Sequence, residues 1–153
     1  MSIEAKLVEL GIELPEVSAP LASYLPVVVE ANVAYVSGQL PFIDGEVLTG
    51  TLGKDVSVEQ GQAGARACAL MILAQLRGAL VPLDRVKRIV KLGAFVASTP
   101  DFTDQHLVAN GASDLMAEVF GKAGRHARAA VGVPALPVGA AVEVDAIVAL
   151  HPD

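Results

Sequence analysis

Two residues of opposite charge stand out near the C-terminal end of the chain, in segments that are otherwise small and apolar. Arg128 lies in the run "HARAAVGV" and Glu143 lies in the run "VEVDAIVAL". The planar guanidinium of an arginine can bind a carboxylate through two parallel hydrogen bonds. A glutamate can orient a water molecule or transfer a proton. Together these side chains could hold a small carboxylate-bearing molecule and act on it.

Side-chain alternation predicts which residues share a face. Both runs read as β-strands, roughly residues 126–133 and 141–150, joined by the loop "PALPVG". His126, Arg128 and Ala130 share one face of the first strand, and Glu143 shares a face of the second strand with Asp145. An antiparallel hairpin would place Arg128 opposite Asp145 and diagonal to Glu143. Two interpretations stay open: an ion pair that fixes the strand register, or a clamp for a ligand.

Other reactive side chains show weaker patterns. Cys68 is the only cysteine and lies in the apolar run "CALMILA", so we expect a buried thiol and no internal disulfide. The three histidines lack metal-ligand spacing, so the sequence predicts no metal site. Ser37 has no evident histidine and acid partners, which argues against a serine hydrolase.

Composition limits the class of protein. The 153 residues suit one domain, 1–153, and with 53% hydrophobic and 18% charged residues we expect apolar surface that faces another subunit. The absence of a long apolar run and the lone cysteine favour a soluble cytoplasmic protein without membrane contact.

Charge argues against nucleic acid as the main partner, because the net charge is −6. One basic cluster, "DRVKRIVK", is the exception. We expect it to be an exposed strand edge that resists unwanted pairing, with an RNA contact as the alternative. The cluster contains Arg85, Lys87, Arg88 and Lys91.

The order of predicted elements indicates an α+β fold with helices on one face of a sheet. A short helix over 2–10 is followed by hairpins that turn at "EAN" and "IDG" and by a long helix that begins after Ser57. A strand over 85–98 precedes a second main helix within 101–120. Asp101 or Thr103 is its expected N-cap and Gly121 its expected end.

Three motifs together resemble the RidA (YjgF) family of imine deaminases, formerly called endoribonuclease L-PSP. They are "SYLP", "VAYVSGQLP" and "HARAAVGVPALPVGAAVEVDAI", and the similarity spans residues 18–150. Residues 1–17 form an extra N-terminal segment. The resemblance implies a chorismate-mutase-like mixed sheet with two main helices on one face. It also implies a homotrimer with a central β-barrel and three ligand clefts between subunits.

The resemblance further implies hydrolysis of reactive enamines or imines such as 2-aminoacrylate to a 2-oxo acid and ammonia, with no cofactor or metal. Arg128 matches the family's carboxylate-binding arginine, and Glu143 matches the glutamate that positions water or relays a proton. The implied substrate-binding positions are Tyr24, Ser37, Asn110 and the backbone near Ala130.

Two other functions remain as alternatives. His126 stands where the family usually has proline or a small residue, and the N-terminal segment is additional. These departures favour a trimeric protein that binds a 2-oxo acid or a related carboxylate without turnover. An endoribonuclease is the weaker alternative, based on the family's former name and the basic cluster.

Overall fold

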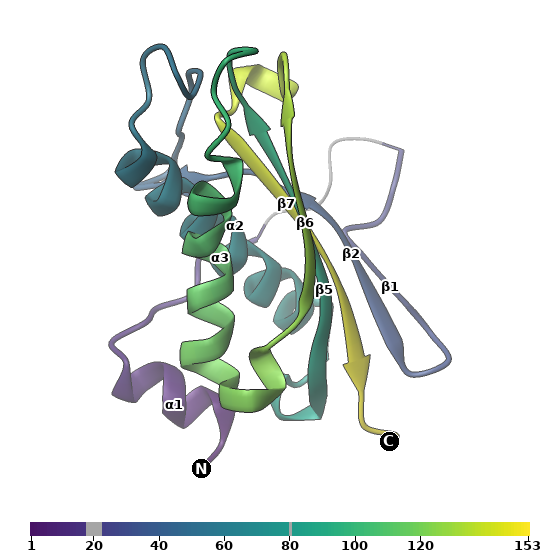
Figure 1. The fold of residues 1–153 in the computed structure, drawn as a ribbon. Coiled ribbons are helices and arrows are strands. Elements are labelled where there is room, and N and C mark those ends of the chain that lie inside the picture. Colours follow the sequence, from purple (N-terminus) through teal and green to yellow (C-terminus); the bar gives the residue numbers. More distant parts are fainter. Residues whose placement is uncertain (18–22, 80) are drawn as a thin grey trace.

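A five-stranded mixed sheet and the helices packed against it form the fold of this computed structural model, which describes residues 1–17, 23–79 and 81–153 (Figure 1). The strand order is β1-β2-β7-β5-β6. The sheet strands are β1 (Val27–Glu30), β2 (Val33–Gln39), β5 (Val86–Ala97), β6 (Ala127–Val133) and β7 (Val142–Leu150). The helices are α1 (Ile3–Glu9), α2 (Val58–Gly78) and α3 (Gln105–Phe120), and a small second sheet pairs β3 (Phe42–Ile43) with β4 (Glu46–Val47). The expected α+β class is confirmed.

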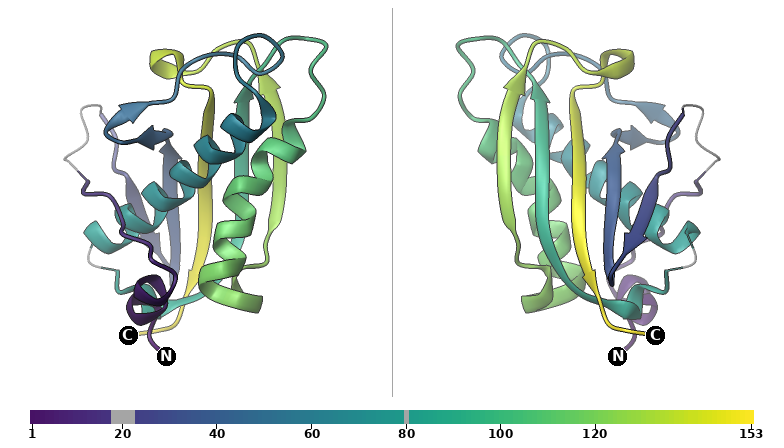
Figure 2. Two further views of the ribbon diagram at one scale, coloured as in Figure 1. Left: turned by 90° about the vertical axis from the view of Figure 1, so that its left-hand side faces the viewer. Right: turned by 90° about the vertical axis from the view of Figure 1, so that its right-hand side faces the viewer.

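The two faces of the large sheet differ in what covers them. The helices α2 and α3 lie on one face, and none of the described helices covers the other, which is the bare face (Figure 2). The core fills the space under the helices with fully buried side chains such as Leu73 and Leu92. On the bare face, Tyr35 and Val131 are 47% and 45% exposed. The apolar surplus in the composition therefore appears as an uncovered sheet face.

The predicted turns and the first long helix are found where the sequence placed them. Asn32 and Asp44 adopt positive φ in the turns that join β1 to β2 and β3 to β4. The Ser57 hydroxyl accepts a hydrogen bond from the Gln60 amide at the start of α2, and the Gln60 side chain accepts one from the Ser57 amide. This reciprocal capping box satisfies amides that have no partner within the helix.

The second main helix begins later than the sequence predicted. The N-cap of α3 is Asp104, and the expected caps Asp101 and Thr103 lie before it. The amide of Phe102 donates to the carbonyl of Thr99, so a turn occupies the segment in which the helix was expected to start. Gly121 ends the helix with a φ of 61°, as expected.

The predicted hairpin between the last two strands is wrong. Among the described strands, β6 pairs with β5 alone, in parallel, and β7 lies between β5 and β2, antiparallel to both. The connection from β5 to β6 runs through α3, and a helical crossover of this kind joins parallel strands. Arg128 is therefore not opposite Asp145.

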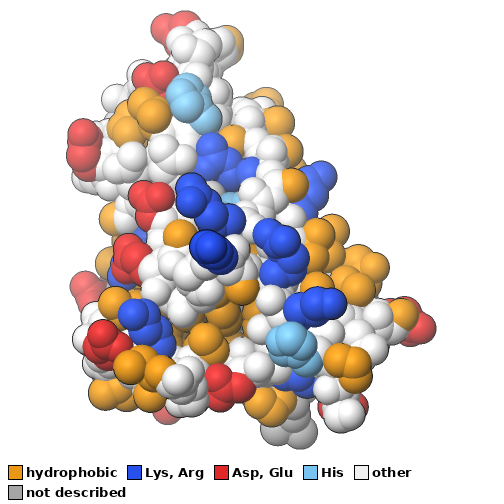
Figure 3. Space-filling model, turned by 60° about the horizontal axis from the view of Figure 1, so that its bottom comes forward, with side chains coloured by type: hydrophobic (Ala, Val, Ile, Leu, Met, Phe, Trp, Pro, Cys, Tyr) orange, Lys and Arg blue, Asp and Glu red, His pale blue; other side chains and the backbone are white. Residues whose placement is uncertain are grey.

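The basic cluster begins just before β5 and continues along its first half, and its expected position at an exposed strand edge is confirmed for Lys87 and Arg88. β6 pairs with β5 only from Lys91 onward, so among the described strands the start of β5 has β7 alone beside it, whereas Lys91 has a strand on each side. Two register shifts interrupt the pairing of β5 with β7. These irregularities leave successive residues exposed together, Lys87 with Arg88 and Val90 with Lys91. β5 begins at the lower end of the molecule, where Figure 3 shows several Lys and Arg side chains gathered.

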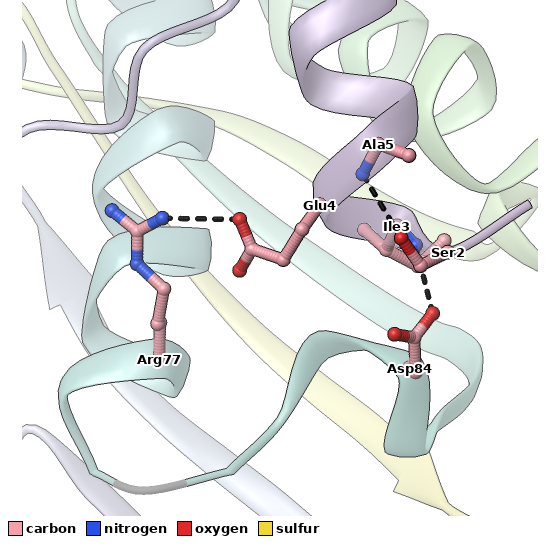
Figure 4. Close-up of polar contacts among 6 residues, drawn as sticks. All are labelled: Ser2, Ile3, Glu4, Ala5, Arg77 and Asp84. Carbon is pink, nitrogen blue, oxygen red and sulfur yellow. Dashed lines mark hydrogen bonds and ion pairs between the residues drawn. The ribbon is translucent and has the colours of Figure 1, made fainter.

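Polar contacts attach the N-terminal helix to the end of α2 and to the turn before β5 (Figure 4). Ser2 caps α1, the amide of Ile3 donates to Asp84 at 2.7 Å, and Glu4 forms an ion pair with Arg77 at 3.3 Å. Leu7 is buried in the core. The expected boundary at residues 17 and 18 falls next to residues 18–22, which lie outside the described residues.

In the part of the chain that the structure describes, no helix is long and apolar enough to cross a membrane.

Replacement of Ser57 by alanine should lower the free energy of unfolding by about 1 kcal/mol, because the first turn of α2 loses its cap. Urea unfolding measures the change. Ser57→Thr keeps a hydroxyl and serves as the control, with an expected loss of less than about half as much. Equal losses in the two variants would contradict the capping role.

Candidate functional site

Arg128 extends from β6 onto the helix-covered side of the sheet. Its register partner on β5 is Leu92, which is fully buried under the helices. The guanidinium reaches α3, where Nη1 donates to Asn110 Oδ1 at 2.9 Å and to Ser113 Oγ at 3.0 Å. Nη2 donates to the carbonyl of His106 at 3.2 Å. The structure thus brings together two predicted site residues, Arg128 and Asn110.

The hydrogen bonds of Arg128 leave part of its guanidinium free. An arginine has five N–H donors, and three of them are used in these contacts. The Nε–H group and one N–H of Nη2 have no acceptor among the described residues. No carboxylate of residues 1–17, 23–79 or 81–153 forms an ion pair with Arg128. The positive charge is therefore fixed by neutral acceptors, and donors remain for an anion.

Glu143 lies on the opposite, bare face of the sheet. Its register partner on β5 is Phe95, three positions beyond the Leu92 that pairs with Arg128. The side chain lies over Gly38 of β2, so that a Cβ added there would fall 2.7 Å from Cδ of Glu143. Within one chain, the predicted catalytic residues Arg128 and Glu143 are therefore on different faces.

Burial and charge change the proton affinity of the two half-buried carboxylates of β7. Burial raises the pKa of Glu143, and the nearby charge of Asp145 raises it further. Burial also raises the pKa of Asp145, although the backbone of Gly93 and the charge of Lys91 act in the opposite direction. A glutamate with a raised pKa can both accept and donate a proton nearer to neutral pH.

Ser37 lies on the side of the sheet that carries Glu143, where it lines a hollow together with Asp145, and Tyr24 lies in the segment just before β1. The hydroxyl of Ser37 on β2 donates to the carbonyl of Leu25 at 2.7 Å. This bond ties β2 to the segment that contains Tyr24, whose side chain is 54% exposed. Gly38, over which Glu143 lies, is the next residue after Ser37. The candidate residues therefore fall into two groups that lie in different parts of the fold.

The first group, near α3 and β6, contains Arg128, Asn110 and Ala130, and the second, near β2 and β7, contains Tyr24, Ser37 and Glu143. Ala130 belongs to the first group because it is half-buried on the same side of β6 as Arg128. The second group contains Glu143, the residue predicted to transfer protons, and the first contains Arg128, the residue predicted to bind an anion.

Cys68 and groups of potential metal ligands add no further candidate residues to these two groups. Cys68 is fully buried, as predicted, and burial raises the pKa of its thiol far above the usual range. Among residues 1–17, 23–79 and 81–153, no three His, Cys, Asp or Glu side chains are grouped to hold a metal ion.

Ser113 and the glycines under the carboxylates were not predicted as site residues. Ser113 follows Asn110 by three residues and His106 by seven, a spacing that places all three on one helix face. This spacing could have identified Ser113 once the segment was known to be helical. Gly38 and Gly93 carry no comparable sequence signal.

A model of the family described as "YjgF/chorismate_mutase-like, putative endoribonuclease" matches residues 4–150. The chain belongs to the RidA (YjgF) family. The expected chorismate-mutase-like fold is thereby confirmed. The resemblance seen in the three sequence motifs therefore extends over almost the whole chain.

Three relatives are similar over nearly their full length. Protein TCP17 of Trypanosoma cruzi is 56% identical over 151 residues, which cover 97% of this chain and 94% of that protein. Atu1372 of Agrobacterium tumefaciens, a protein with unknown function, shares 50% identity and a TM-score of 0.89, with 99% and 94% covered. A Shewanella oneidensis protein described as a "putative endoribonuclease" shares 35% identity and a TM-score of 0.93, with 98% and 100% covered.

Replacement of Glu143 by glutamine should stabilise the chain at pH 8 by less than about 1 kcal/mol, because the half-exposed side chain is partly screened by solvent. A raised pKa means that the folded chain binds this proton more tightly than the unfolded chain does. The free energy of unfolding therefore falls as pH rises from the ordinary pKa of a glutamate toward the raised pKa of Glu143. Glutamine does not ionise, so the variant does not have this loss.

Urea unfolding at pH 8 and pH 4 measures this effect, and the gain should shrink at pH 4. Glu16→Gln, at an exposed carboxylate, is the control. An equal gain at both pH values would show that ionisation of Glu143 is not the cause.

Proposed function

We propose that the protein is a hydrolytic deaminase of small enamines or imines that carry a carboxylate, such as 2-aminoacrylate. The observation that carries this proposal is the hydrogen bonding of Arg128. Neutral acceptors hold its guanidinium in place, and two of its N–H donors stay available for an anion. Membership of the RidA family supports the reaction class.

The reaction makes few demands beyond binding, water and proton transfer. An enamine such as 2-aminoacrylate first tautomerises to the imine, whose carbon is already electrophilic. Water adds across the C=N bond to give a carbinolamine, a proton moves from its hydroxyl group to the nitrogen, and the C–N bond breaks to give a 2-oxo acid and ammonia. Arg128 would hold the carboxylate, and Glu143 would take a proton from water and return it to nitrogen. Neither the addition of water nor the proton transfers need a metal or an organic cofactor.

The separation of Arg128 from Glu143 favours a site shared between subunits. The two residues project from opposite faces of one sheet, so a single chain does not place a substrate between them. We propose that the protein is a homotrimer in which each cleft takes Arg128 from one subunit and Glu143 from the next. Head-to-tail contacts of this kind close into a ring. The exposed apolar residues on the bare face provide surface that such a ring would bury.

Arg128→Ala should lower kcat/KM for 2-aminoacrylate by about 100-fold or more, because it removes two charge-assisted hydrogen bonds to the substrate. Ammonia and 2-oxo acid release, with 2-aminoacrylate generated in place by a dehydratase, is the measurement. Arg125→Ala is the matched control, since that side chain is exposed and lies three residues away.

A wild-type rate no faster than the spontaneous reaction would refute the deaminase. Thermal stabilisation by 2-oxobutanoate without turnover would then favour the binding protein considered from the sequence.

Mixed trimers test whether the site is shared. Arg128→Ala and Glu143→Gln should each be inactive, whereas subunits unfolded, mixed in equal amounts and refolded should recover up to about one quarter of the wild-type rate. That fraction follows because one cleft in four would combine an intact Arg128 with an intact Glu143. No recovery, although native mass spectrometry shows mixed trimers, would place both residues of a cleft on the same subunit.

A further inference from the structure

Ser113 connects Arg128 to a histidine that the proposed reaction does not use. Its hydroxyl oxygen lies 3.0 Å from Nη1 of Arg128 and 2.8 Å from Nε2 of His126. The other ring nitrogen of His126, Nδ1, lies 2.7 Å from the carbonyl oxygen of Gly124. Arg128, Ser113, His126 and the Gly124 carbonyl thus form one continuous line of hydrogen bonds.

The direction of every bond in this line follows from what each group can do. A carbonyl oxygen only accepts, so Nδ1 of His126 carries the hydrogen and donates it to Gly124. In the neutral ring Nε2 then accepts, and the donor is the Ser113 hydroxyl. The oxygen of Ser113 keeps its lone pairs for Nη1 of Arg128, which only donates. One tautomer of His126 therefore satisfies all four groups.

The fold places these groups together through the close approach of α3 to the segment before β6. Gly124 lies against the backbone of α3, and a Cβ there would overlap the carbonyl oxygen of Met116. Ser113 and Asn110 lie one helical turn apart on α3, and both accept from Nη1 of Arg128. His126, two residues before Arg128, reaches the same turn of the helix.

We propose that Ser113 and His126 are positioning residues that hold the Arg128 guanidinium in the orientation that presents its free N–H groups to the substrate carboxylate. This inference rests on the proposed function. Two acceptors on Nη1 prevent the guanidinium from rotating, and His126 fixes the hydroxyl that supplies one of them. A guanidinium that is already ordered loses less conformational entropy when the carboxylate binds.

The first test separates positioning from general stability. Ser113→Ala should raise KM for 2-aminoacrylate about 5-fold and leave kcat within about 2-fold, because a carboxylate grip acts equally in the ground state and the transition state. Ser113→Thr keeps the hydroxyl and should return KM to within about 2-fold of wild type. Ser57→Ala is the matched control: it removes a helix cap, away from Arg128, and should leave KM unchanged.

The second test concerns His126. The leucine of His126→Leu cannot accept a hydrogen bond from the Ser113 hydroxyl, so KM should rise about 3-fold. His126→Gln offers an amide oxygen as acceptor, and its KM should stay closer to that of the wild type. Nitrogen chemical shifts of the imidazole in the wild-type protein should show hydrogen on Nδ1 at neutral pH. Hydrogen on Nε2 would overturn the hydrogen-bond line whatever the activity.

The outcomes distinguish the inference from the function on which it rests. If the wild type is active and Arg128→Ala is not, but Ser113→Ala changes KM no more than Ser57→Ala does, positioning is refuted and the deaminase stands. If the wild type neither hydrolyses 2-aminoacrylate nor is stabilised by 2-oxobutanoate, the proposed function fails and positioning for a substrate fails with it.

Discussion

The fixed positive charge of Arg128 is the interaction on which the rest of the candidate site depends. A guanidinium at the junction of a strand and a helix would ordinarily be neutralised by a carboxylate. Here its described partners are an amide oxygen, a hydroxyl and a backbone carbonyl, all from α3. These acceptors fix the side chain without cancelling its charge. Anion binding is the chemical property that such an arrangement leaves available.

The crossover from β5 through α3 to β6 produces this arrangement. It makes β6 parallel to β5 and brings α3 alongside β6, so that Arg128 meets the helix instead of the acidic residues of β7. The same topology puts β7 in the middle of the sheet, where Glu143 and Asp145 face away from the helices. Separation of the cation from the acids within one chain is therefore a property of the strand order. A shared cleft between chains is one way to reunite them.

Local features of this fold could be predicted from the sequence, whereas the pairing of distant strands could not. Ser57 as a cap and the turns at Asn32 and Asp44 depend on residues close in sequence, and they were correctly placed. Alternation correctly put Arg128 and Ala130 on one side of a strand. Alternation contains no information about which strand lies alongside. The predicted hairpin was therefore wrong, and so was the contact between Arg128 and Asp145 that depended on it.

Gly38 and Gly93 affect the shape of the bare face. Each glycine lies beneath a carboxylate of β7, Gly38 under Glu143 and Gly93 under Asp145, in space that a methyl group would fill. Both acids can therefore lie against the sheet instead of standing out from it. The bare face is hollowed beside them, in a cavity whose lining includes Ser37, Gly93 and Asp145. Because Gly93 has no side chain to fill this hollow, a projecting group of a neighbouring protein surface can enter it and meet the carboxylate of Asp145.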